Sequence, residues 1–183
     1  MFILYAVVLG LIAGLLLGGR PAGLGTLSFR WAWVFLAGLA IQVVLFSDAV
    51  TSRIGDLGAL IYVLSTALVV AAVVANRRIT GLPVVAVGAV CNLAAIVANG
   101  GYMPASLSAL ATLGRVPKIV YSNSAVVQDP ALAPLGDVFA LPSWLPFSNI
   151  FSVGDVLIGL GVAIVIVVAM RARPADPLSP GAA

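Results

Sequence analysis

Two aspartates in the second half of the chain share the tripeptide Gly-Asp-Val. Asp137 follows Gly136, and Asp155 follows Gly154. Two carboxylates that share a proton can activate water, because their like charges keep one acid protonated while the other acts as a base. Paired-carboxylate hydrolysis is therefore the one catalytic hypothesis that these residue types support.

The rest of the composition excludes most other catalytic and metal centres. The chain has no histidine, no glutamate and a single cysteine, Cys91, which lies inside an apolar run. Histidine-ligated haem, Ser-His-Asp triads, HExxH zinc sites and Cys-His nucleophiles are thereby excluded. No glycine-rich phosphate loop with its lysine occurs. We therefore expect no metal, no cofactor and no enzymatic activity.

The residues around Asp155 allow two interpretations. The tripeptide Val153-Gly154-Asp155 resembles a degraded GxGD motif of intramembrane aspartyl proteases, but Ser152 stands where that motif has glycine. Ser152 also suits a helix N-cap, and a carboxylate three residues later favours the free N–H groups of the first turn. Helix capping is therefore the preferred interpretation, and proteolysis with Asp137 as the second acid is a remote alternative.

Membrane helices must position these residues, because the chain is too apolar for a water-soluble domain. Hydrophobic residues make up 62% of the 183 residues and charged residues 8%. Apolar runs of roughly 17 to 25 residues cross a bilayer, and lipid forces them to be helical. The sequence predicts one all-α, polytopic membrane domain over residues 1–170 and a disordered cytoplasmic tail over 171–183. The five predicted spans cover residues 2–19, 31–47, 58–76, 82–99 and 154–170.

Charged residues divide unevenly between the two sides of these spans. One side carries Asp176 and six arginines: Arg20, Arg30, Arg77, Arg78, Arg171 and Arg173. The other side carries Arg53, Arg115 and Lys118 with five aspartates: Asp48, Asp56, Asp129, Asp137 and Asp155. The net charges are 6 − 1 = +5 and 3 − 5 = −2. The positive-inside rule then predicts a cytoplasmic C-terminus and an N-terminus outside the cell.

Small and polar residues inside the spans predict how the helices pack. Gly10, Gly14 and Gly18 recur every four residues, so they share one helix face and allow another helix to approach closely. Asn92 and Gln42 are polar residues within spans, and we expect each to hydrogen-bond to a neighbouring helix. No charged residue lies near the middle of a span, which argues against a coupled transporter.

Residues 100–153, called the outer cap below, form a segment too long for a simple connection. Asn99, Gly100 and Gly101 are expected to end the fourth span. Pro104 suits the first turn of a short helix over 104–113, which would lie on the membrane surface or dip into it. The outer cap therefore has predicted structure of its own.

The second half of the outer cap is rich in prolines and aromatic residues. Pro142 and Pro146 prevent a continuous helix, and Trp144 lies between them. Aromatic side chains of this kind prefer the membrane interface or a groove between helices. We therefore expect the segment to fold over the outer ends of the bundle.

Three short motifs carry a family resemblance. They are NGGYMP at 99–104, which contains Met103, LGDVFALP at 135–142 and FSVGDVLIGLG at 151–161. With the order of the spans, they resemble a family of uncharacterised bacterial multi-pass membrane proteins, catalogued as a domain of unknown function. The resemblance covers about residues 1–170 and implies a bacterial cell-membrane location. It implies no activity, substrate or catalytic residue.

Taken together, these features favour a non-catalytic membrane protein that is embedded in the lipid bilayer. Its outer cap is expected to contact a partner membrane protein, a lipid or a small apolar ligand. A passive channel or uncoupled transporter is the alternative, with Gln42 and Asn92 on its path and the outer aspartates at a cation-attracting mouth. Nucleic acid is not an expected partner, because no basic stripe with interleaved aromatics occurs.

Overall fold

The computed structural model describes residues 2–114 and 122–172, which form a mostly helical protein. The five main helices are α1 (Phe2–Leu16), α2 (Ala32–Leu45), α4 (Leu57–Ala75), α5 (Leu82–Ala98) and α7 (Val153–Arg171). Two short helices, α3 (Asp48–Thr51) and α6 (Leu107–Thr112), and two 3-10 turns, η1 (Pro21–Thr26) and η2 (Ala133–Leu135), lie between them. The disordered tail was predicted over residues 171–183, and residues 173–183 lie outside the described part of the chain.

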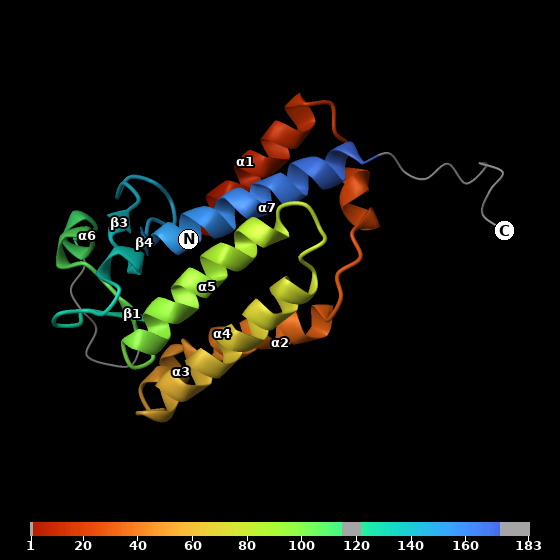
Figure 1. Cartoon of the computed structure of the whole chain (residues 1–183). Coiled ribbons are helices and arrows are strands. Elements are labelled where there is room, and N and C mark those ends of the chain that lie inside the picture. The colour runs from red at the N-terminus through yellow and green to blue at the C-terminus, as the bar shows by residue number, and fades with distance from the viewer. Residues whose placement is uncertain (1, 115–121, 173–183) are drawn as a thin grey trace, which may run out of the picture.

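The main helices form a single row. Contacts join α1 to α7, α7 to α5, α5 to α4 and α4 to α2 (Figure 1). The helix α7 therefore lies between the N-terminal helix and α5, although it comes last in the chain. The ends of these helices lie on two opposite sides of the row, and the outer cap lies over one of these sides, which we call the cap end (Figure 1).

Two of the helices, α4 and α7, are long and apolar enough to cross a membrane by length and composition. Each has 19 residues, whereas α1, α2 and α5 have 15, 14 and 17. Most residues of each long helix are at least partly exposed, since 33% of the apolar stretch of α4 and 28% of that of α7 are buried. Apolar helices that bury so little of their surface favour association with a membrane.

Glycines bring α1 and α7 into close contact, as the sequence predicted for two of them. A Cβ at Gly10 would lie 3.0 Å from the Ala163 Cα, and one at Gly14 would meet the Met170 side chain. The prediction for Gly18 is wrong. The helix ends at Leu16, and Gly18 has a φ of 77° with no atom near its missing side chain. Gly18 therefore turns the chain and packs against no helix.

The outer cap contains short strands as well as a helix, so the fold is not purely α-helical. The strands β1 (Met103–Pro104) and β2 (Ser124–Ala125) pair in parallel, and β3 (Phe139–Ala140) and β4 (Ile150–Phe151) pair antiparallel. The predicted helix over 104–113 is shorter than expected and begins at Leu107. Pro104 belongs to β1 instead, where it pairs with Ala125 of β2.

Asn99 fastens the outer cap to the end of α5. Its Nδ2 donates to the carbonyls of Ala95 and Ala131, at 2.7 and 2.8 Å, and its Oδ1 accepts from the Ala131 N–H at 2.9 Å. Gly100 and Gly101 follow with φ values of 68° and 91°, which end the helix as predicted. One side chain therefore both caps α5 and holds a segment 32 residues away.

Candidate functional site

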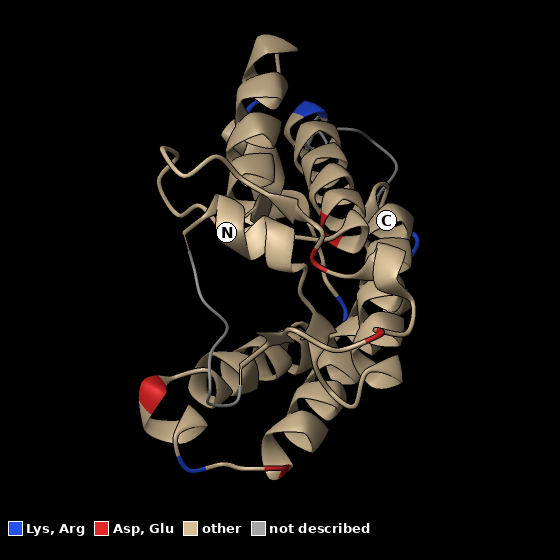
Figure 2. Cartoon of the chain, turned by 90° about the vertical axis from the view of Figure 1, so that its left-hand side faces the viewer, with Lys and Arg blue, Asp and Glu red and all other residues tan. Residues whose placement is uncertain are grey.

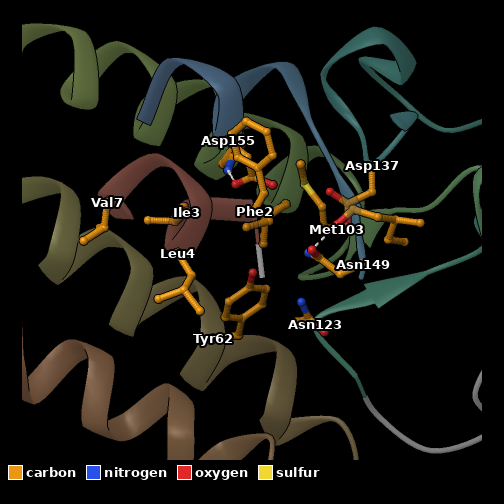
Figure 3. Close-up of a pocket in the computed structure, with 13 residues that line it drawn as sticks. Phe2, Ile3, Leu4, Val7, Tyr62, Met103, Asn123, Asp137, Asn149 and Asp155 are labelled. Atoms are coloured by element: carbon orange, nitrogen blue, oxygen red, sulfur yellow. Dashed lines mark hydrogen bonds between the residues drawn. The ribbon is translucent and has the colours of Figure 1, made fainter. Parts of the chain in front are cut away.

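A cavity of about 480 Å³ lies at the cap end, between the helices and the outer cap. Its walls come from the start of α1, from α4, α5 and α7, and from both strand pairs of the cap (Figure 3). Most of the lining side chains are apolar: Phe2, Ile3, Leu4, Val7, Ile96, Met103 and Ile150, with Tyr62 beside them. Five polar side chains complete the lining: Asn92, Asn123, Asn149, Asp137 and Asp155.

Asp155 is held at this cavity by a closed network of hydrogen bonds. The Ser152 Oγ accepts from the Asp155 N–H at 3.0 Å, and the Ser152 N–H donates to Asp155 Oδ2 at 3.1 Å. The pair is the predicted capping box at the start of α7. Asn92 on α5 joins it, donating to Asp155 Oδ1 at 2.9 Å and accepting from the Ser152 Oγ at 2.8 Å. The predicted contact of Asn92 with a neighbouring helix is thus confirmed.

Gly154 makes this network possible. A side chain at this position would overlap the Asn92 carboxamide and come within 2.7 Å of the Gly88 carbonyl oxygen. Gly88 on α5 meets the backbone of α7 in the same way. Because neither glycine has a Cβ, α5 and α7 approach closely enough for Asn92 to reach the first turn of α7.

Asp137 reaches the cavity from the strand region of the cap. Its backbone N–H donates to the Pro104 carbonyl at 2.8 Å, its carbonyl accepts from the Ser106 N–H at 3.1 Å, and its Oδ2 accepts from the Ser124 Oγ at 2.6 Å. The residue is only 6% exposed. Burial raises the pKa of Asp137 to about 6, the Ser124 hydrogen bond opposes this rise, and the negative charge of Asp155 adds to it.

The two aspartates therefore line one cavity, although they come from different parts of the fold. No basic side chain is among the lining residues that the structure describes. The described aspartates all lie at the cap end, toward the viewer in Figure 2, where the acidic positions are red. A carboxylate-bearing apolar cavity without a basic partner complements a ligand that has an apolar body and a cationic or hydrogen-bond-donating group.

Aromatic contacts support Phe2, which lines the cavity. The Phe2 ring stacks on Phe151 with centroids 4.4 Å apart, and the centroids of Phe139 and Phe151 are 5.4 Å apart. The Tyr5 hydroxyl donates to the Pro146 carbonyl. The first turns of α1 are thereby fixed against the cap.

The predicted site residues fall into three groups. Asn92, Met103, Asp137 and Asp155 line the cavity. Ser152 and Gly154 support it from α7, while Asn99, Gly100, Gly101 and Pro104 shape or fasten the cap without lining it. Trp144 does not take part, since it is 79% exposed and lies on the surface of the cap.

Sequence reasoning missed much of the lining. Phe2, Ile3 and Leu4 belong to an apolar span in which no residue type marks one face as special. Tyr62 had a detectable signal, because it carries a polar group within an apolar run, and Asn149 stands out among aromatic and apolar neighbours. Within the described ranges, no group of three or more cysteines and aspartates is placed to hold a metal ion.

Comparison with known proteins places the chain in a family. The model of a family of unknown function, DUF5317, matches residues 26–167, which include the whole outer cap, all of α2, α4 and α5, and α7 as far as residue 167. No curated protein and no solved structure matches the chain.

Proposed function

This chain belongs to the DUF5317 family of unknown function, and we propose that it is a non-catalytic, multi-pass bacterial membrane protein that binds a small amphiphilic molecule in the cavity under its outer cap. The cavity carries the ligand-binding proposal, because it combines apolar walls with two carboxylates and three carboxamides. Its volume of about 480 Å³ lies within the range of about 300 to 1,000 Å³ that is typical of small-molecule sites.

The distribution of side chains supports five spans. Large apolar residues such as Leu9, Leu36 and Leu60 are exposed on the outer sides of α1, α2 and α4. Fully buried positions include the small residues Ala72, Ala95 and Ser65. This arrangement suits helices that pack through small residues and present large ones to lipid. The bilayer can thin locally around the shorter helices, at a modest cost in free energy.

The ends of the helices support the proposed orientation. The described arginines Arg20, Arg30, Arg77, Arg78 and Arg171 lie opposite the cap, at what we call the arginine end. The described aspartates lie at the cap end together with Arg53. The positive-inside rule assigns the arginine end to the cytoplasm and the cap to the outside.

Cysteine labelling of intact cells tests the five spans and their orientation. In a Cys91→Ser background, single cysteines replace Ser52 and Ser143 at the cap end or Ser28 and Thr80 at the arginine end. All four positions are exposed. A membrane-impermeant maleimide should label Ser52→Cys and Ser143→Cys before lysis, and the other two only after lysis. Equal labelling of all four in intact cells contradicts the proposal.

A pair of probes with the same apolar body tests ligand binding. Adamantylamine is cationic and adamantane carboxylate is anionic at neutral pH, so only the amine complements the acidic cavity. Calorimetric titration of the purified protein in a neutral detergent should show saturable binding of the amine alone. Asp155→Asn should weaken it by roughly tenfold or more, because a charge-assisted hydrogen bond contributes about 1.5 to 3 kcal/mol.

Two further variants separate cavity binding from partition into detergent. Ile96→Trp fills the cavity and should abolish saturable binding, whereas Asp129→Asn removes an exposed charge outside it and should leave binding unchanged. Equal uptake of both probes, or no effect of Ile96→Trp, contradicts the ligand-binding proposal.

A passive channel remains the alternative, and the acidic face of the cap end favours it as a cation-attracting mouth. Gln42 donates to the Thr66 Oγ at 3.2 Å, which joins α2 to α4, and Asn92 is engaged with α7. Both residues expected on a path therefore have structural roles. Cation flux into protein-containing liposomes above that of empty liposomes would favour the channel.

The two carboxylates at one cavity also make the proteolytic alternative testable. Each has a structural partner, Ser124 for Asp137 and the Asn92–Ser152 network for Asp155, which accounts for both without catalysis. Cleavage of a membrane-embedded test substrate by the wild type, lost in Asp155→Asn, would establish the protease and overturn the non-catalytic proposal.

A further inference from the structure

A second cavity, of about 360 Å³, lies at the arginine end of the bundle. It forms where the connection from α4 to α5 meets the residues that precede α2. Arg30, Arg77 and Arg78 line it, together with Ser28 and Asn76. It is separate from the ligand cavity, which lies at the opposite ends of the same helices.

Asn76 fixes the two segments that carry the arginines. Its Nδ2 donates to the carbonyls of Ala72 and Arg30, and its Oδ1 accepts from the Arg30 N–H, each at 2.7 Å. The residue is 4% exposed, and the next residue after Arg30, Trp31, has a φ of 58°. The backbone of Arg30 is thereby held next to the turn that carries Arg77 and Arg78, before any ligand binds.

Among the residues that the structure describes, these three arginines have no counter-charge at the cavity. No described carboxylate lines it, and every described aspartate belongs to the cap end. Like charges gathered at one cavity repel each other, and a bound anion relieves this repulsion. Guanidinium groups present paired N–H donors that match phosphate oxygens in a bidentate geometry.

We propose that this cavity binds a phosphate group through Arg30, Arg77 and Arg78. Anionic phospholipid headgroups and free phosphate share this chemistry. Ile79 lines the cavity, and Trp33 on the first turn of α2 is 74% exposed, so apolar surface suited to acyl chains adjoins the arginines. The site goes beyond the proposed ligand cavity and does not depend on it.

A topological role for the arginines requires positive charge alone, whereas phosphate binding requires the guanidinium geometry. The decisive variant is therefore the triple Arg30→Lys, Arg77→Lys and Arg78→Lys, which keeps every charge and should insert normally. The matched control is Arg20→Lys with Arg171→Lys, which changes two arginines at the same end that do not line the cavity.

Two measurements on the purified full chain in neutral detergent distinguish the sources of phosphate. Native mass spectrometry compares retention of phosphatidylglycerol and phosphatidylcholine with identical acyl chains, and thermal unfolding is followed with and without inorganic phosphate. Preferred retention of phosphatidylglycerol identifies a lipid headgroup, and stabilisation by phosphate without that preference identifies the free anion.

In either case, the lysine triple should weaken the effect about tenfold, because each lysine presents a point charge where the arginine presents a planar pair of donors. The control pair should behave as the wild type. The proposal is overturned if neither phosphatidylglycerol nor phosphate acts on the wild type, or if the control pair weakens the effect as much as the triple does.

Discussion

The Asn92 carboxamide donates a hydrogen bond of 2.9 Å to the Asp155 carboxylate, across 63 residues and from one helix to another. The same carboxamide accepts from the Ser152 hydroxyl. One side chain thus satisfies both members of the capping box that starts α7. This contact couples helix packing to the position of a carboxylate at the cavity, so a change at Asn92 affects both.

Replacing Asn92 with Ala should lower the free energy of unfolding by about 1 to 3 kcal/mol, because it leaves the buried Ser152 hydroxyl without its acceptor. Reversible unfolding by dodecyl sulfate in mixed micelles measures the change. Gln42→Ala is the matched control, since it removes one interhelical bond to Thr66 outside any network. Its cost should lie near the average of about 0.6 kcal/mol for such bonds in membranes. Equal costs would contradict the cooperative network.

Replacing Gly154 with Ala should separate α5 from α7. The added methyl group overlaps the Asn92 carboxamide and the Gly88 carbonyl, so the helices must move apart, at a cost of about 1 to 3 kcal/mol or more. The same unfolding assay measures it. Gly25→Ala is the control, because no atom lies within 4 Å of its missing side chain. A neutral Gly154→Ala would show that the close approach is not needed.

The stability of the protein should depend on pH through Asp137. Its folded-state pKa of about 6 lies above the ordinary 3.8, so the folded state binds a proton that the unfolded chain releases. The free energy of unfolding should therefore fall as pH rises from about 4 to about 7, by at most about 3 kcal/mol, and then level off.

Asp137→Asn should flatten this part of the pH profile, because the amide cannot titrate. Unfolding curves of the wild type and the variant at several pH values between about 4 and 8 provide the comparison. Asp129→Asn, at an exposed position, should retain the wild-type slope. A slope that survives in Asp137→Asn would assign it to another group.

Replacing Asn99 with Ala should loosen the outer cap without unfolding the helices. The variant loses three hydrogen bonds, two of them to Ala131. Hydrogen exchange at residues 131–137 should therefore accelerate, while exchange in α4 and α7 stays as in the wild type. Thr112→Ala is a control from the same cap, since the exposed Thr112 Oγ1 bonds to the Ser108 carbonyl within α6. Unchanged exchange in Asn99→Ala would show that the cap is held elsewhere.

The prediction of helices succeeded where the signal was local. The apolar runs predicted all five main helices, with boundaries within three residues of those observed. They did so because hydrophobicity and the hydrogen bonding of the helical backbone both depend on consecutive residues. Gly100 and Gly101 ended α5, and Ser152 with Asp155 began α7, for the same reason. Pro104 was placed wrongly in a helix, since its strand partner Ser124–Ala125 is distant in sequence.

The candidate site was predictable only in part. The sequence by itself determined an apolar helical chain, its uneven charge, and residues such as Asn92, Asp137 and Asp155 that needed polar partners. Only the tertiary structure decided that Asp137 and Asp155 share a cavity with Phe2 and Tyr62, and that Gly14 packs while Gly18 does not. The reason is physical: composition and capping act along the chain, whereas a cavity depends on the relative positions of helices and strands that distant contacts fix.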